Sequence, residues 1–117
     1  MSDTLAVLDQ KKAIQLVSGN KKLADDLLLM FINELPEYKQ GIQKELKKAN
    51  KEELRKIIHK MHGGLRYVGA TALLDIVSST DLKLFELSDD LLMHNITLIY
   101  QEMERLIKEG KYCKKIS

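Results

Sequence analysis

Apolar positions along the chain recur at steps of three and four residues, the spacing that places side chains on one face of an α-helix. The longest such stripe lies between Lys21 and Ala49 and contains Leu23, Leu27, Leu28, Phe31, Leu35, Tyr38, Ile42 and Leu46. No segment shows the alternation of apolar and polar residues that is typical of a half-buried strand. The pattern therefore predicts an all-α fold.

Glycines and capping residues divide this pattern into five predicted helices. Asp9 can cap the first helix, and Asn50 followed by Glu53 has the spacing of a capping box that opens the third. Pro36 lies inside the second helix and should kink or split it. The expected helices cover residues 9–18, 21–49, 51–68, 70–85 and 88–108, and the last ends before Gly110.

The connections between these helices are only a few residues long, so consecutive helices should lie antiparallel. We therefore expect an antiparallel up-down four-helix bundle with a short extra N-terminal helix. The 117 residues suit a single domain over residues 1–117, with a core at about 9–110 and a frayed, basic tail at 111–117.

Composition and charge exclude several classes of protein. The chain has 19 basic and 17 acidic residues, a balance that does not fit a dedicated nucleic-acid binder. Its apolar runs are too short to span a bilayer, and its N-terminus lacks the basic and apolar regions of a secretory signal. The single cysteine, Cys113, excludes an internal disulfide and fits a reducing cytosol. We expect a cytoplasmic chain, whose parent protein could still be membrane-bound if the chain is a piece of a longer one.

The third predicted helix places a histidine opposite its core stripe. At about 100° per residue, the positions within about 60° of Met61 are apolar, namely Leu54, Ile57, Ile58, Leu65 and Val68. His59 falls at about 160° from Met61 and should therefore face solvent. Its neighbours on the outer face are Arg55, Lys56, Gly63 and Arg66, and Lys60 and His62 lie towards the sides.

This outer face suits phosphoryl chemistry. An exposed, neutral imidazole nitrogen can attack phosphorus, and nearby cations can offset the negative charge that arrives. Gly63 lies one turn from His59; a glycine inside a helix costs about 1 kcal/mol relative to alanine, and Gly64 doubles that cost. A bare surface of this kind allows a second protein to approach the imidazole closely. The residues alone leave open a merely solvated histidine, and glycines that serve helix packing or mark a bend.

The segment from Ile57 to Leu73 contains His59-Lys60-Met61-His62-Gly63, followed by Val68-Gly69-Ala70. This pattern resembles the histidine phosphotransfer (HPt) family, whose motif reads approximately His-x-Leu-Lys-Gly, several small or polar residues, and then Leu-Gly-Ala. The stretches Leu27–Pro36 and Leu16–Leu23 resemble that family's second helix and first turn. The resemblance covers about Asp9 to Leu106 and is closest to modules that end hybrid sensor histidine kinases feeding stationary-phase or virulence regulators.

The resemblance implies a phosphorelay carrier: His59 would accept a phosphoryl group from a receiver-domain aspartate and pass it to an aspartate of a response regulator. The chain has no nucleotide-binding motif, so it would not be an enzyme in its own right. It would need no cofactor, because Mg²⁺ is expected on the partner receiver only. The alternative from the residues is a helical adaptor or dimerisation bundle that serves only for contact.

The expected phosphate environment consists of His62, Gly63, Arg55, Lys56 and Arg66. His62 stands where the family usually has lysine, so its charge depends on pH, and Arg66 stands where the family often has a small residue. Leu29 lies about 160° from Phe31 on its helix and is either a single exposed leucine or part of a docking patch. The expected partner-docking residues are Leu29, Gly63 and Gly64.

A metal site is the remaining alternative for the histidines. His59 and His62 could share an ion with His94 as a third ligand. The two imidazoles diverge by about 60° around the helix, and no carboxylate or cysteine is spaced to complete the set. We therefore expect no metal site.

Overall fold

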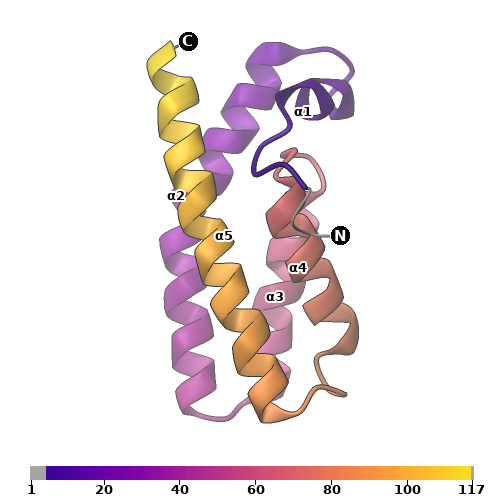
Figure 1. Ribbon diagram of the computed structural model, residues 1–117, viewed down its shortest axis with the longest axis vertical. Helices are drawn as coiled ribbons and strands as arrows, with labels where there is room; N and C mark the ends of the chain where they lie inside the picture. The colour runs from indigo at the N-terminus through magenta and orange to yellow at the C-terminus, as the bar shows by residue number, and fades with distance from the viewer. Residues whose placement is uncertain (1–4, 117) are drawn as a thin grey trace.

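The computed structural model describes the backbone of residues 5–116 and the side chains of residues 5–110. Over this range it contains no strand and five helices, α1 (Gln10–Leu16), α2 (Lys21–Lys47), α3 (Lys51–Leu65), α4 (Thr71–Lys83) and α5 (Asp89–Ile116). Helices α2 to α5 pack in antiparallel order, α5 also contacts α2, and the short α1 packs on α2 (Figure 1). The predicted all-α, up-down four-helix bundle with a short N-terminal helix is confirmed.

Polar side chains cap the helices where the sequence indicated. The oxygens of Asp9, Asn20, Asn50 and Ser88 accept hydrogen bonds from the amides of Lys12, Leu23, Glu53 and Leu91 at 3.0–3.2 Å. Each bond satisfies one of the amide groups that a helix start leaves without a partner. The predicted caps at Asp9 and Asn50 are therefore confirmed, and Ser88 caps the helix that was expected to begin at residue 88.

Helix α4 begins without a side-chain cap of its own, and the N-terminal segment supplies the missing acceptor. The Ala6 carbonyl accepts hydrogen bonds from the Thr71 hydroxyl at 2.6 Å and from the Ala72 amide at 3.0 Å. The Asp9 amide donates to the Gly69 carbonyl at 2.9 Å. Gly69 has a φ of +79°, and a Cβ there would meet the Asp9 carbonyl at 2.7 Å, so glycine allows this close approach. The segment thus fixes the turn between α3 and α4.

The core lies along the inner faces of α2 to α5. Its fully buried large side chains are Leu35, Ile42, Leu54, Ile58, Met61, Leu65, Leu73, Leu84, Ile96, Ile99, Leu106 and Val77. The stripe predicted around Met61 is buried, except for Ile57, which is only partly buried. On α2 the stripe holds from Phe31 to Ile42, whereas Leu23 is 42% exposed near the start of the helix.

Pro36 does not split α2, so of the predicted kink or split only the split is excluded: the helix runs unbroken from Lys21 to Lys47, with the side chains of Leu35 and Tyr38 buried on either side of the proline. The predicted end of the last helix is wrong. Helix α5 does not end before Gly110 but continues to Ile116, so residues 111–116 are helical and not a frayed tail. A Cβ at Gly110 would collide with Cδ1 of Ile32. This glycine therefore serves the close approach of α5 to α2 and is not a stop signal.

No helix within residues 5–116 combines the length and the apolar character that crossing a bilayer requires.

Candidate functional site

His59 lies on the outer face of α3, as predicted. Its side chain is 59% exposed, whereas Met61, Leu65 and Leu54 below it are at most 1% exposed. Asn50 and the acidic pair Glu52 and Glu53 stabilise the start of the helix, the end at which partial positive charge gathers. The buried stripe fixes the rotation of α3 and thereby holds the imidazole outward.

A carboxylate from the neighbouring helix meets this imidazole. Asp81 of α4 places Oδ2 at 2.8 Å from Nδ1 of His59 and at 2.9 Å from Nδ1 of His62. The Asp81 side chain is only 6% exposed. One buried oxygen therefore holds both rings, which lie edge to face with their centroids 6.4 Å apart.

The contact with Asp81 decides which nitrogen of His59 can react. A carboxylate only accepts hydrogen bonds, so Nδ1 of His59 must carry the proton that it donates to Oδ2. In the neutral ring the lone pair then resides on Nε2, the other ring nitrogen. With Nδ1 occupied by this hydrogen bond and more than half of the side chain exposed, Nε2 is the nitrogen open to chemistry.

The charge of Asp81 is maintained by the same contacts. Burial alone would raise the pKa of this carboxyl, but hydrogen bonds from His62 and His59, together with the positive charge of these rings when protonated, hold the pKa below its ordinary value. The other carboxylate oxygen, Oδ1, is buried and has no hydrogen-bond partner. Nε of Arg55 lies 3.8 Å from Oδ1 and contributes charge without a hydrogen bond.

A polar contact between α4 and α5 helps to position Asp81. The preceding residue, Thr80, is fully buried and donates its hydroxyl hydrogen to the carbonyl of Ile76 at 2.7 Å. The hydroxyl oxygen of Thr80 accepts from Nδ2 of Asn95 on α5 at 3.2 Å. These bonds tie the last turns of α4 to the bundle, so the carboxylate next to them is presented to α3 from a fixed backbone.

The sequence reasoning missed Asp81. On α4 it lies on the same face as Leu73, Val77 and Leu84, all of which are buried. A single acidic residue on the apolar face of a helix is unusual, because an unpaired buried charge is costly. That position is the signal that could have identified Asp81, but it does not reveal which residues would partner it.

The predicted phosphate environment is brought together only in part. His62 is 17% exposed and joins the cluster through Asp81, and Arg55 lies beside that carboxylate. Lys56 pairs with Glu53 of its own helix at 3.0 Å. Arg66 is exposed and caps the C-terminal end of α3, and within residues 5–110 no hydrogen bond or ion pair joins it to the cluster. The roles of all four in binding phosphate stay predictions.

The two glycines differ in their surroundings. A Cβ at Gly63 would have no neighbouring atom within 4 Å, so the surface next to His59 is open there. A Cβ at Gly64 would contact the ring of Phe31 at 3.4 Å, so this glycine lies against α2. Leu29 of α2 is 41% exposed, and Met30 beside it is more exposed still. Partner docking by these residues stays a prediction.

Contrary to the sequence reasoning, a carboxylate does complete a set of metal-ligating groups with the two histidines. The ligand atoms of His59, His62 and Asp81 all lie within 4.8 Å of one another. Asp81 comes from another helix, so spacing along α3 did not reveal it. His94, the third ligand considered from the sequence, is exposed on α5 and does not belong to the group.

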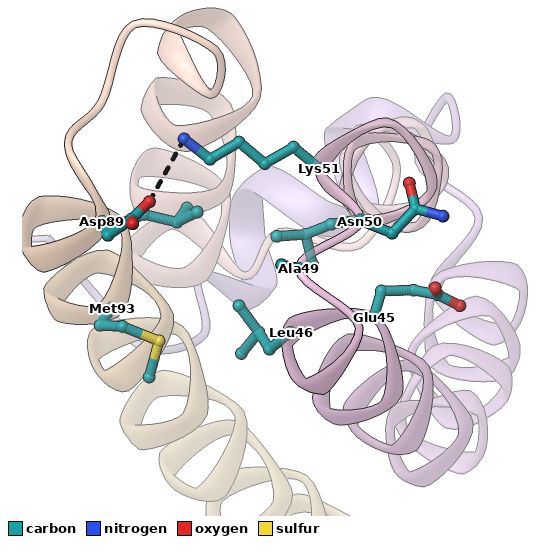
Figure 2. A pocket seen from close by; sticks show the side chains of 9 residues that line it. Glu45, Leu46, Ala49, Asn50, Lys51, Asp89 and Met93 are labelled. Atoms are coloured by element: carbon teal, nitrogen blue, oxygen red, sulfur yellow. Dashed lines mark ion pairs between the residues drawn. The ribbon is translucent and has the colours of Figure 1, made fainter.

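A pocket lies elsewhere, where the α2–α3 turn meets the start of α5 (Figure 2). Its volume is about 250 Å³, and its lining includes Leu46, Leu54 and Met93, as well as Lys51 and Asp89, which form an ion pair at 3.5 Å. None of the residues of the histidine cluster lines it. The candidate site is therefore the exposed cluster on α3 and α4 and not this pocket.

Comparisons with known proteins match the part of the chain that contains the cluster. The family model described as the Hpt domain matches residues 26–109, a range that contains the whole cluster. The signal transduction histidine-protein kinase BarA of Escherichia coli K12 is 38% identical over 64 residues, which cover 55% of this chain and 7% of that kinase. The sensor histidine kinase GacS of Pseudomonas protegens is 32% identical over 69 residues, which cover 59% of this chain and 8% of that kinase.

The fold has a counterpart among solved structures. The crystal structure of an HPT domain from a Shewanella hybrid histidine kinase superposes with a TM-score of 0.84, covering 95% of this chain and 96% of that one at 21% sequence identity. At that identity the likeness shows the fold, whereas the match of the family model over most of the chain shows the family. The chain therefore belongs to the family of Hpt domains.

Proposed function

We propose that this Hpt domain is a phosphorelay carrier, which accepts a phosphoryl group on Nε2 of His59 from a receiver-domain aspartate and passes it to an aspartate of a response regulator. The observation that carries the proposal is the pairing of an exposed His59 ring with the buried Asp81 carboxylate at 2.8 Å. This pairing supports a ring that is oriented, has the reactive lone pair on Nε2, and remains accessible to another protein.

The bonds and charges of this transfer balance without a nucleotide. The lone pair of Nε2 forms the N–P bond while the P–O bond to the receiver aspartate breaks, and the aspartate recovers its carboxylate charge. Nδ1 keeps its proton, so the phosphorylated ring is formally cationic, and the charge of Asp81 offsets it. In the forward step to a second receiver, the leaving group is the neutral imidazole of His59. Its proton stays on Nδ1, hydrogen-bonded to Asp81, so the ring is again in the reactive tautomer. Asp81 acts as a positioning residue, because it touches the ring and not the phosphoryl group.

The surroundings of His59 would stabilise the phosphoryl group and admit the partner. Arg55, Lys56 and Arg66 supply positive charge on or next to α3, and His62 adds one when protonated. The open surface at Gly63 lets a receiver bring its aspartate into in-line geometry, with Gly64 and Leu29 forming the flank of the docking surface.

The partners follow from this chemistry. They would be the receiver domains of a hybrid sensor kinase and of a response regulator, and Mg²⁺ would belong to the receivers. The chain itself would act as a cytoplasmic monomer without a cofactor or an ATP site. The names of the similar kinases support this assignment, although this chain matches only 7–8% of their length.

The test is transfer of label from a receiver domain phosphorylated with ³²P. The chain should take up label that is stable to alkali and labile to acid, as phosphohistidine is, and return it to a second receiver. His94→Gln is the matched control, since His94 is also an exposed histidine but lies outside the cluster. If label appears equally in His59→Gln, or fails to appear in the wild-type chain with any receiver of a hybrid kinase or response regulator from the same organism, the proposal is wrong.

A further inference from the structure

We propose that His59, His62 and Asp81 form a binding site for a divalent transition-metal ion, with Zn²⁺ as the best chemical match, and that the bound ion prevents phosphorylation of His59. The first half of the proposal stands on the geometry of the cluster, and only the second half rests on the proposed function. The ion would act as an inhibitor and not as a cofactor.

The geometry of the cluster fits three ligands of one ion. Two imidazole nitrogens, both Nδ1, converge on Oδ2 of Asp81 at 2.8 Å and 2.9 Å. Zn²⁺ binds nitrogen and oxygen ligands at about 2.0–2.2 Å, so the ligands of a tetrahedral ion lie about 3.4 Å apart. Each imidazole nitrogen therefore needs to move roughly 0.6 Å away from Oδ2, which requires a rotation of the exposed His59 ring and of the partly buried His62 ring. Imidazole and carboxylate ligands are those that suit Zn²⁺.

The charge of the cluster also favours a cation. Asp81 is a buried carboxylate, and its Oδ1 has no hydrogen-bond partner, so the protein leaves part of its negative charge uncompensated, which an ion bound at Oδ2 would offset. The exposure of His59 leaves an open side, where water can complete the coordination. Arg55 opposes binding, because its Nε lies 3.8 Å from Oδ1. Removal of that charge should therefore strengthen binding of the ion.

Binding of the ion and phosphorylation exclude each other through the tautomer of His59. The ion needs the lone pair of Nδ1, whereas the hydrogen bond to Asp81 needs a proton there. When the ion binds, that proton leaves Nδ1 and the neutral ring carries its proton on Nε2 instead. Nε2 then has no lone pair with which to attack phosphorus. The ion thus blocks the reactive nitrogen without covering it, because both functions use the His59 ring and its contact with Asp81.

Direct binding tests the first half. Untagged chain carrying Cys113→Ser, which removes the thiol, is titrated with ZnCl₂ by calorimetry and with CoCl₂ by visible absorption. We expect one ion per chain, and an affinity reduced about tenfold or more by His59→Gln, by His62→Gln and by Asp81→Asn. His94→Gln should bind as the parent does, and Arg55→Gln should bind more tightly. Circular dichroism verifies that each variant is folded; His59→Gln, at an exposed position, keeps the test decisive if Asp81→Asn unfolds.

Chemical phosphorylation tests the second half without a receiver. Phosphoramidate serves as the donor, and the rate of labelling of His59 should fall in proportion to the fraction of chain that holds Zn²⁺. The variant His62→Gln keeps His59 but lacks one ligand. Its rate of labelling should be the same with and without Zn²⁺ at that concentration. Labelling that proceeds undiminished in a Zn²⁺-saturated parent chain would refute the inhibition.

The experiments can refute either proposal without refuting the other. If Zn²⁺ binds through the three residues but no receiver exchanges phosphate with His59, the metal site stands and the carrier function is wrong. If the chain exchanges phosphate but takes up no Zn²⁺, or binds it equally well after Asp81→Asn, the metal site is wrong and the carrier function stands.

Discussion

Nδ1 of His59 lies 2.8 Å from Oδ2 of Asp81, although the two residues are 22 positions apart and belong to different helices. The contact joins the exposed ring of His59 to a carboxylate that is only 6% exposed. Under the proposed function, the reactivity of His59 therefore depends on how α4 packs against α3. Replacement of His59 and replacement of Asp81 should therefore have different effects: the first should abolish phosphorylation, and the second should slow it.

Asp81→Asn should slow phosphorylation of His59 without abolishing it. An amide at this place removes the negative charge and can present a donor to Nδ1, which favours the unreactive tautomer. We expect a loss of roughly 10- to 100-fold in the rate of transfer from a saturating receiver, with little change in the receiver concentration that gives half-maximal rate. Stopped-flow or rapid-quench measurement of ³²P transfer determines both quantities.

A readout of the tautomer separates positioning from a general loss of structure. The ¹⁵N chemical shifts of the His59 ring should report a proton on Nδ1 in the wild-type chain and a mixture of tautomers in Asp81→Asn. Asp75→Asn is the matched control, since Asp75 is an exposed aspartate on the same helix. Wild-type ring shifts and wild-type rates in Asp81→Asn would show that the carboxylate serves only the packing of α4.

His59→Gln should abolish phosphate uptake while it leaves the fold nearly unchanged. The side chain is exposed, and Asp81 keeps its hydrogen bond from His62. We expect a change in the free energy of unfolding below about 1 kcal/mol, as at most surface positions. Urea denaturation followed by circular dichroism measures it. A much larger loss of stability would mean that His59 supports the buried charge of Asp81, and that transfer must be tested with a milder variant.

Much of the fold could be predicted because periodicity and caps are local properties of the sequence. The rotation of α3 followed from the stripe around Met61, and it correctly placed His59 outside. Asp81 could not be found in this way, because its partners lie on another helix and only the packing of α4 on α3 joins them. Gly110 was misread for the same reason: its neighbour, Ile32, is distant in sequence, and without it a glycine resembles a helix stop.

Gly69→Ala should destabilise the chain more than Gly19→Ala. Both glycines have positive φ, +79° and +85°, so alanine at either place costs about 1–2 kcal/mol of backbone strain. At Gly69 the new Cβ would also meet the Asp9 carbonyl at 2.7 Å and Cβ of Ala13 at 2.8 Å, whereas at Gly19 it would meet nothing within 4 Å. Comparison of the two variants by urea denaturation removes the shared strain. Equal losses would show that the N-terminal segment can move away from the α3–α4 turn without cost.

Gly63→Gln should block exchange of phosphate with receiver domains but not the folding of the bundle. Glycine is unfavourable inside a helix, and the position is open, so replacement should stabilise the chain by up to about 1 kcal/mol. The longer side chain would stand one turn from His59, where a receiver must bring its aspartate into near-attack geometry. The expected result is a variant that melts at or above the wild-type temperature and yet receives little label from a phosphorylated receiver.

A small donor shows whether this block is steric. Phosphoramidate needs no docking surface, so it should phosphorylate His59 in Gly63→Gln at close to the wild-type rate, while transfer from the receiver is lost. The rate of transfer from the receiver to Gly63→Ala should lie between the rates for the wild-type chain and for Gly63→Gln, because a single methyl group fills less of the space through which the receiver approaches. Equal impairment with both donors would locate the damage in the imidazole itself. Unimpaired transfer from the receiver in a folded Gly63→Gln chain would mean that the partner approaches His59 from another side, and that the docking surface around Gly63 was assigned incorrectly.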